Sequence, residues 1–190
     1  MLRNHTAKLM PVVNLADPNA PLPDYLVVDA SLLLVLRSRS QHPHQAHAIA
    51  FLQRVGQECL AGNTVRLAPT LVLEECYFKI VQAYIEGLAH TLWHRYYKLN
   101  PQVIQQCLPA ITAFHQAVEA LPVTIITPED LALKQPSYTL EERMRHFISA
   151  CNLLPKDAYI LAVAERLGVR DVATLDSDWQ RATQFTVYTC

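Results

Sequence analysis

Acidic side chains that follow apolar runs are the residues of this 190-residue chain best placed to do chemistry. Asp29 directly follows the apolar run of residues 25–28, and Asp176 and Asp178 follow the run of residues 172–175. Carboxylates gathered in one place repel one another and take up protons unless a cation joins them. Such hard oxygen ligands suit Mg²⁺ or Mn²⁺, and two of these ions, roughly 3.5–4 Å apart, activate water for attack on a phosphodiester.

Three further acids stand in or at the start of helical stretches. Glu74 and Glu75 lie on the helix expected after a strand at 65–68, and Asp157 stands near the start of another helix. Consecutive helical residues point about 100° apart, so one glutamate of the pair should face the site. The competing interpretation is structural, because Asp at a strand end often forms a turn or caps a helix. Asp157 in particular also fits the N-cap of its helix.

The elements that position these acids alternate between strand and helix. Short runs of β-branched and apolar residues predict strands at 25–29, 65–68, 123–126, 172–175 and 186–189. Helical spacing of apolar residues predicts helices at 31–37, 42–60, 70–85, 89–120 with a break near 100–101, 140–151 and 157–167, the last ended by Gly168. This order predicts an α/β fold with a mostly parallel sheet between helices, in which the carboxyl ends of the strands meet at one edge.

Composition and charge exclude several classes of protein. With 51% hydrophobic and 17% charged residues the chain is globular, and a net charge of −1 gives no basic field for a large nucleic-acid surface. Five cysteines without a CxxC pair predict reduced thiols. No apolar run approaches the ~20 residues of a membrane span, so we expect a cytoplasmic protein without a membrane partner.

We divide the chain into an N-terminal extension (1–24) and one domain (25–190) with a helical middle region at about 89–120.

Four segments of the sequence resemble the motifs of PIN domains, in the order that this family has them. Residues 27–31 (VVDAS) resemble the first motif, and residues 69–75 (PTLVLEE) resemble the second, glutamate-bearing motif. Residues 154–164 (LPKDAYILAVA) resemble the third, in which an aspartate opens a helix of small residues, and residues 172–179 (VATLDSDW) resemble the fourth. The resemblance implies a PIN-like three-layer sandwich and a ribonuclease that depends on Mg²⁺ or Mn²⁺.

The resemblance also implies a role for particular side chains. The acids that would bind the metal and carry catalysis are Asp29, Glu75, Asp157 and Asp176, with Asp178 as an accessory metal ligand. Glu75 is preferred to Glu74 because Leu71 and Val72 precede it at the spacing usual in the family. Ser31 and Thr174 would orient a carboxylate or the substrate. Independently of the resemblance, Arg37 follows the first motif near the expected cleft and is a candidate for contact with phosphate, the alternative being a solvated side chain.

The function predicted from these observations is a metal-dependent endoribonuclease that hydrolyses RNA. Its expected setting is that of a VapC-like toxin held in check by a small antitoxin protein, although the N-terminal extension and the long middle region depart from compact toxins. The alternatives are a PIN-fold RNA-binding or scaffold protein with little activity and a different metal-dependent phosphohydrolase. Trp93, Tyr96 and Tyr97 in the middle helices predict an apolar contact surface and a homodimer.

Overall fold

The computed structural model describes residues 12–37, 43–89, 92–132 and 138–190. A central sheet of six parallel strands has the order β1-β6-β5-β2-β3-β4. The strands are β1 (Val12–Asn14), β2 (Tyr25–Val28), β3 (Val65–Pro69), β4 (Val123–Ile126), β5 (Asp171–Ala173) and β6 (Thr186–Thr189). The expected mostly parallel sheet between helices is therefore confirmed.

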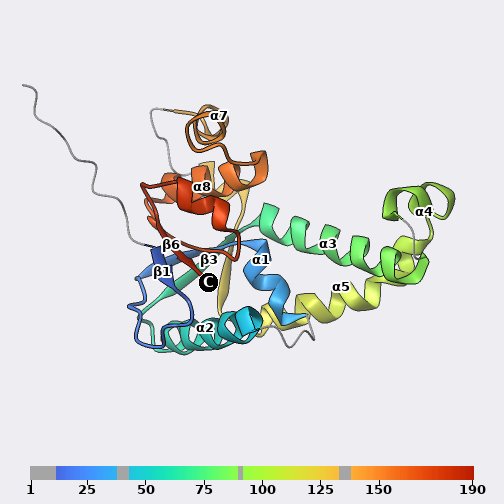
Figure 1. Cartoon of the computed structure of the whole chain (residues 1–190), viewed down its shortest axis with the longest axis horizontal. Coiled ribbons are helices and arrows are strands. Elements are labelled where there is room, and N and C mark those ends of the chain that lie inside the picture. Colours follow the sequence, from blue (N-terminus) through green and yellow to red (C-terminus); the bar gives the residue numbers. More distant parts are fainter. Residues whose placement is uncertain (1–11, 38–42, 90–91, 133–137) are drawn as a thin grey trace, which may run out of the picture.

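The helices follow the predicted alternation closely. They are α1 (Ala30–Leu33), α2 (Pro43–Leu60), α3 (Thr70–Ala89), α4 (Trp93–Leu99), α5 (Val103–Glu119), α6 (Pro128–Ala132), α7 (Leu140–Cys151) and α8 (Pro155–Leu167), with 3-10 turns η1 (Leu34–Leu36) and η2 (Ser177–Arg181). Figure 1 shows α2 on one side of the sheet and α7 and α8 on the other, which makes three layers. Covering both faces explains why the central strands are rich in apolar residues, although β3 also carries the buried Arg66.

Strand order creates a topological switch point between β2 and β5. From β2 the chain adds β3 and then β4 on one side, whereas β5 and β6 add to the other side. β2 and β5 are hydrogen-bonded neighbours, with Val28 opposite Ala173. The crevice beyond the carboxyl ends of two such strands is where open parallel sheets bind ligands. Asp29 and Thr174 are the residues that directly follow β2 and β5.

Helix α8 contributes a continuous buried segment to the core. Five consecutive residues of α8, Ile160 to Ala164, are buried. Pro155 occupies the first turn of α8, and Gly168 ends the helix with φ +78°, a left-handed conformation that suits glycine. Asp157 therefore lies in the first turn of a helix whose position is fixed by its packing.

Residues near the N-terminus form a strand that the sequence analysis did not assign. β1 pairs in parallel with β6 at the edge of the sheet, and the backbone N–H of Leu15 donates to the carbonyl of Thr189 at 2.9 Å. The Arg54 side chain on α2 donates to the carbonyls of Pro18 and Ala20. Residues 12–20 are thus bound to the sheet and to α2, whereas residues 1–11 of the expected extension lie outside the described residues.

The predicted helical middle region forms an arm. Figure 1 shows α3 and α5 running side by side away from the sheet, with α4 at the far end. Tyr77 on α3 holds α5 through a 2.7 Å hydrogen bond to Nδ1 of His115 and an edge-on contact with the ring of Phe114. Apolar side chains remain exposed along this arm, at Phe78, Leu88, Leu92, Tyr97, Leu99 and Leu108.

Within the described ranges, no single helix is long and apolar enough to cross a membrane, and only the bent pair of α7 and α8 meets that test when both are taken together.

Candidate active site

Four acidic side chains from four separate segments line one cavity of about 260 Å³. They come from the end of β2, from α3, from the first turn of α8 and from the loop after β5. The cavity lies at the switch point of the sheet, where the carboxyl ends of β2 and β5 meet. Its lining residues are Asp29, Ala30, Ser31, Leu34, Glu75, Lys79, Leu154, Asp157 and Asp176.

Asp29 is held by hydroxyl groups from both sides of the switch point. Its Oδ2 atom accepts from the hydroxyl of Ser31 at 2.6 Å, from the hydroxyl of Thr174 at 2.9 Å and from the Ser31 backbone N–H at 3.2 Å. Its backbone N–H donates to the carbonyl of Ala173 at 3.0 Å, which continues the β2–β5 pairing by one residue. Asp29 is only 5% exposed, so these donors stabilise a carboxylate that has little water around it.

The same hydroxyls shape the loop that carries Asp176. Thr174, which is fully buried, accepts the backbone N–H of Asp176 at 3.0 Å on the oxygen that donates to Asp29. Ser31 accepts the backbone N–H of Leu175 at 2.9 Å. Asp176 then caps η2, because its Oδ1 atom accepts the N–H of Asp178 at 2.8 Å. Two hydroxyls therefore fix the relative position of two of the acids.

The phase of α3 separates the two adjacent glutamates. Glu75 lines the acidic cavity, whereas Glu74, about 100° around the helix, lines a second cavity. The Glu75 carboxylate lies 3.7 Å from Nζ of Lys156, and one turn along α3 Lys79 lines the acidic cavity too. The structure thus places Glu75, the glutamate that the sequence analysis preferred, at the cavity.

Asp157 carries a carboxyl group with a shifted pKa. Its pKa is raised from 3.8 to about 6, first because it is partly buried and then because the charges of Asp29 and Asp176 repel its ionised form. The Trp179 indole N–H acts in the opposite direction. That N–H has no hydrogen-bond partner of good geometry, so its contact with Asp157 is weaker than a full hydrogen bond.

The N-cap interpretation of Asp157 is wrong. Leu154 is the N-cap residue of α8, no side chain caps that end, and Asp157 is the third residue of the helix. α8 begins two residues earlier than predicted because Pro155 is pre-organised for the first helical position. The carboxylate of Asp157 is therefore not used as a cap, and it faces the cavity.

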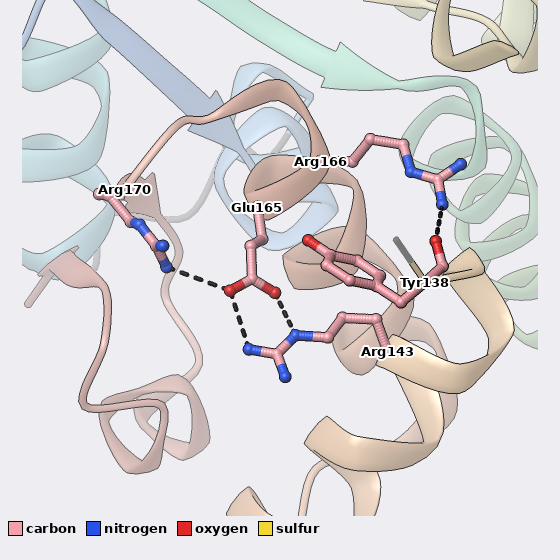
Figure 2. A network of polar contacts seen from close by, with 5 residues as sticks. All are labelled: Tyr138, Arg143, Glu165, Arg166 and Arg170. Atoms are coloured by element: carbon pink, nitrogen blue, oxygen red, sulfur yellow. Dashed lines mark hydrogen bonds and ion pairs between the residues drawn. The ribbon is translucent and has the colours of Figure 1, made fainter. Parts of the chain in front are cut away.

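An ion-pair network outside the cavity fixes α8 against its neighbours (Figure 2). Glu165 on α8 accepts a bidentate pair of hydrogen bonds from Arg143 on α7 and a 3.3 Å contact from Arg170, which precedes β5. Arg166 donates to the carbonyl of Tyr138 at 2.9 Å. Bidentate arginine–carboxylate contacts define orientation as well as distance. The network ties α7, α8 and the start of β5 together.

Comparison with known proteins agrees with this architecture. The profile of the PIN domain family matches residues 26–184. The chain belongs to the PIN domain family. The resemblance drawn from the four sequence motifs is thus confirmed, and the match covers strands β2 to β5 together with all four acids.

Two solved structures are similar to this chain at low sequence identity. The Mycobacterium tuberculosis toxin VapC20, described as cleaving the sarcin–ricin loop, is 16% identical with a TM-score of 0.46, and the match covers 83% of this chain and 94% of that one. VapBC2 of Rickettsia felis, bound to a DNA fragment from its promoter, is 11% identical with a TM-score of 0.46, covering 87% and 98%. Among curated proteins, none matches this sequence.

The donors of this PIN-domain cavity fit a hard divalent cation by their chemistry. Four carboxylates gather without a histidine or cysteine among the lining residues. The pKa of Asp157 is raised first by burial and then by the charges of Asp29 and Asp176. Across the described parts of the chain, no three or more His, Cys, Asp or Glu side chains are arranged as a finished ligand set. The fit therefore rests on the type and charge of the donors.

Two of the residues expected at the site lie beside the cavity. Asp178 does not line it, and its carboxylate forms a 2.9 Å ion pair with Arg181. Arg37 lines an adjoining cavity of about 530 Å³ that shares Leu34 and Lys79 with the acidic one. Arg37 also donates to the carbonyl of Ile80 at 3.4 Å, which anchors its side chain on α3.

Two lysines of the PIN domain were missed by the sequence analysis. Lys79 lines both the acidic cavity and its neighbour, and Lys156 contacts Glu75. The i, i+4 spacing of Glu75 and Lys79 was a signal for the first, because such residues share a helix face. Lys156 carried no comparable signal, since its contact joins two helices far apart in the sequence.

Proposed function

We propose that this protein is an endoribonuclease that uses Mg²⁺ or Mn²⁺ to hydrolyse RNA phosphodiester bonds. The single observation that carries the proposal is the convergence of four carboxylates on one cavity in a PIN domain, with the pKa of Asp157 raised to about 6. A cavity lined by four carboxylates stores repulsion that a cation relieves.

Asp29, Glu75, Asp157 and Asp176 would hold the cation. When bound, it would supply Lewis-acid stabilisation of the phosphate oxygens and a nucleophilic water at neutral pH. The protein's own contribution is orientation. Thr174 and Ser31 donate to Oδ2 of Asp29. These two contacts fix the plane of the carboxylate and therefore also the direction of its other oxygen, Oδ1.

Positive side chains beside the acids would bind the RNA backbone. Lys79 lines the acidic cavity, and Lys79 and Arg37 together line the adjoining cavity of about 530 Å³. If one phosphate of the RNA were bound between Lys79 and Arg37, the next phosphodiester along the strand would lie toward the carboxylates. Such contacts give affinity without sequence preference and weaken with added salt.

Cleavage of RNA by purified protein tests the proposal. The protein is unfolded and refolded first, which removes any copurified inhibitor, and is then incubated with mixed single-stranded RNA in Mn²⁺, in Mg²⁺ and in EDTA. Asp29→Asn should abolish cleavage, whereas the matched control Glu141→Gln, an exposed acid on α7, should not. Cleavage unchanged in EDTA contradicts the metal mechanism. No cleavage in either metal favours the scaffold interpretation.

We also propose that a small antitoxin protein inhibits the enzyme. In addition, we propose that the α3–α5 arm forms the interface of a homodimer. The apolar side chains exposed on the arm support the dimer, although Trp93 itself packs edge-on against Phe78 at 5.2 Å. Leu99→Glu should dissociate the dimer in light scattering. Leu60→Glu is the matched control, because both leucines are 82% exposed and Leu60 lies on α2. A wild-type monomer at working concentrations contradicts the dimer.

A further inference from the structure

A second cavity, of about 340 Å³, lies directly beside the acidic one. It forms where the first turns of α3 and α8 meet α6 and α7. We call it the base pocket. Its lining residues are Thr70, Leu71, Glu74, Pro128, Met144, Pro155, Lys156 and Tyr159.

We propose that the base pocket binds one nucleobase next to the scissile phosphodiester and thereby determines where the enzyme cuts. The inference deepens the proposed ribonuclease function and rests on it. It assigns to this pocket a ligand class, a purine base of single-stranded RNA, and to Glu74 the role of reading that base.

The base pocket and the acidic cavity share their dividing wall. Glu74 lines one and Glu75 lines the other, from adjacent positions on α3. Lys156 lines the base pocket while its Nζ atom lies 3.7 Å from the Glu75 carboxylate, and the next residue, Asp157, lines the acidic cavity. A nucleotide whose phosphate occupied the acidic cavity would therefore have its own base, or that of its neighbour, within reach of the pocket.

The chemistry of the walls fits a flat ring with a polar edge. Leu71, Met144, Pro155 and the ring of Tyr159 supply apolar and aromatic surface, on which a base stacks favourably. Polar groups stand at particular points of the rim: the Glu74 carboxylate accepts hydrogen bonds and the Lys156 ammonium donates them. A sugar or phosphate would be poorly matched to the apolar walls.

Glu74 is available for this role. Among the described residues, none makes a hydrogen bond or ion pair with its side chain, although its neighbour Glu75 is paired with Lys156. A carboxylate at the rim of an apolar pocket disfavours an apolar peptide and favours a ligand with N–H donors. Guanine presents two adjacent donors, N1–H and the N2 amino group, which match the two carboxylate oxygens. We therefore expect a preference for guanine.

The pocket is formed before any ligand binds. Met144 follows Arg143, whose bidentate contact with Glu165 holds α7 against α8 (Figure 2). On the opposite wall, the Thr70 hydroxyl donates to the carbonyl of Ile126 at 2.9 Å, which ties the start of α3 to the end of β4. A preformed pocket loses little ordering entropy on binding, so a single base can contribute measurable selectivity.

Base binding without cleavage is the first test. Guanosine and 5′-GMP, with AMP, CMP and UMP for comparison, are titrated into the full chain in EDTA and followed by NMR. We expect saturable binding of the guanine compounds, weakened by about tenfold in Glu74→Gln, the order expected for loss of one bidentate contact. Glu129→Gln, an exposed acid on α6, is the matched control and should bind like wild type. No guanosine binding to wild type at millimolar concentration overturns the proposal.

Cleavage preference is the second test. A random single-stranded RNA pool is digested in Mn²⁺ and the ends are sequenced. Wild type and Glu129→Gln should favour guanine at one position beside the cut, and Glu74→Gln should lose that preference or shift it toward adenine, to which a glutamine amide pairs well. An unaltered preference in Glu74→Gln overturns the assignment. If the protein cleaves no RNA, the proposed function fails, while the EDTA titration still decides whether the pocket binds a base.

Discussion

Replacing Asp157 by Asn should make the metal-free protein more stable at neutral pH. The pKa of Asp157 rises from 3.8 to about 6 on folding, a difference that corresponds to about 3 kcal/mol. Because the carboxyl is only partly buried, solvent screening reduces this figure, and we expect about 1–2 kcal/mol. Asn has nearly the same shape without the charge. For a domain of this size each kcal/mol moves Tm by about 2–4 °C.

The sign of the effect depends on pH. The folded protein binds this proton more tightly than the unfolded chain, so the ionised carboxylate costs stability as pH rises from about 4 through about 6. The advantage of Asp157→Asn should therefore be complete at pH 7.5 and absent near pH 4. Adding Mn²⁺ should reverse the order at pH 7.5, because the wild type binds the cation more tightly than a variant with a neutral amide.

Thermal unfolding in EDTA at pH 4 and pH 7.5, repeated with Mn²⁺ at pH 7.5, measures these differences, and RNA cleavage is assayed alongside. Asp178→Asn is the matched control. It removes an acid five residues after β5 that is paired with Arg181 and does not line the cavity, so it should bring no gain at pH 7.5. If Asp157→Asn melts below wild type at pH 7.5 in EDTA, the carboxylate holds the fold through an attraction, and the repulsion argument is refuted.

Two further substitutions test the supports of the site and of the sheet. Thr174→Val removes a donor to Asp29 and an acceptor for the Asp176 N–H. It should therefore destabilise the protein by about 1–3 kcal/mol and reduce kcat beyond the effect on folding. Thr174→Ser should restore both stability and kcat in unfolding and cleavage assays. The Arg66 guanidinium is fully buried, donates to the carbonyl of Leu52 and has two nitrogens without a partner. Arg66→Met should therefore leave the free energy of unfolding in urea unchanged or raise it by up to about 3 kcal/mol. A marked loss of stability in Arg66→Met would mean that this buried charge is compensated.

The sequence by itself determined the fold class and the order of the elements. Strands β2, β3 and β4 were evident because short runs of β-branched and apolar residues are typical of strands. The end of α8 was evident because Gly168 adopts a left-handed conformation that other residues avoid. The sequence also marked the acids as a group, since parallel strands that alternate with helices bring their carboxyl ends to one edge.

The tertiary structure alone decided how the acids are supported and what lies next to them. β1 escaped prediction because its three residues pair with β6 at the opposite end of the chain, and a contact so distant leaves no local pattern. The exact start of α8 removed the N-cap interpretation of Asp157, and the phase of α3 directed Glu74 into one cavity and Glu75 into another.

The tertiary structure alone also decided the hydroxyl contacts, the lysine positions and the base pocket. Thr174 reaches Asp29 across 145 residues of chain, and Lys156 reaches Glu75 from a different helix. Local propensity and periodicity report how a segment folds and which of its faces is buried. They do not report which side chains of two segments meet, because that depends on the packing of the whole sheet and its helices.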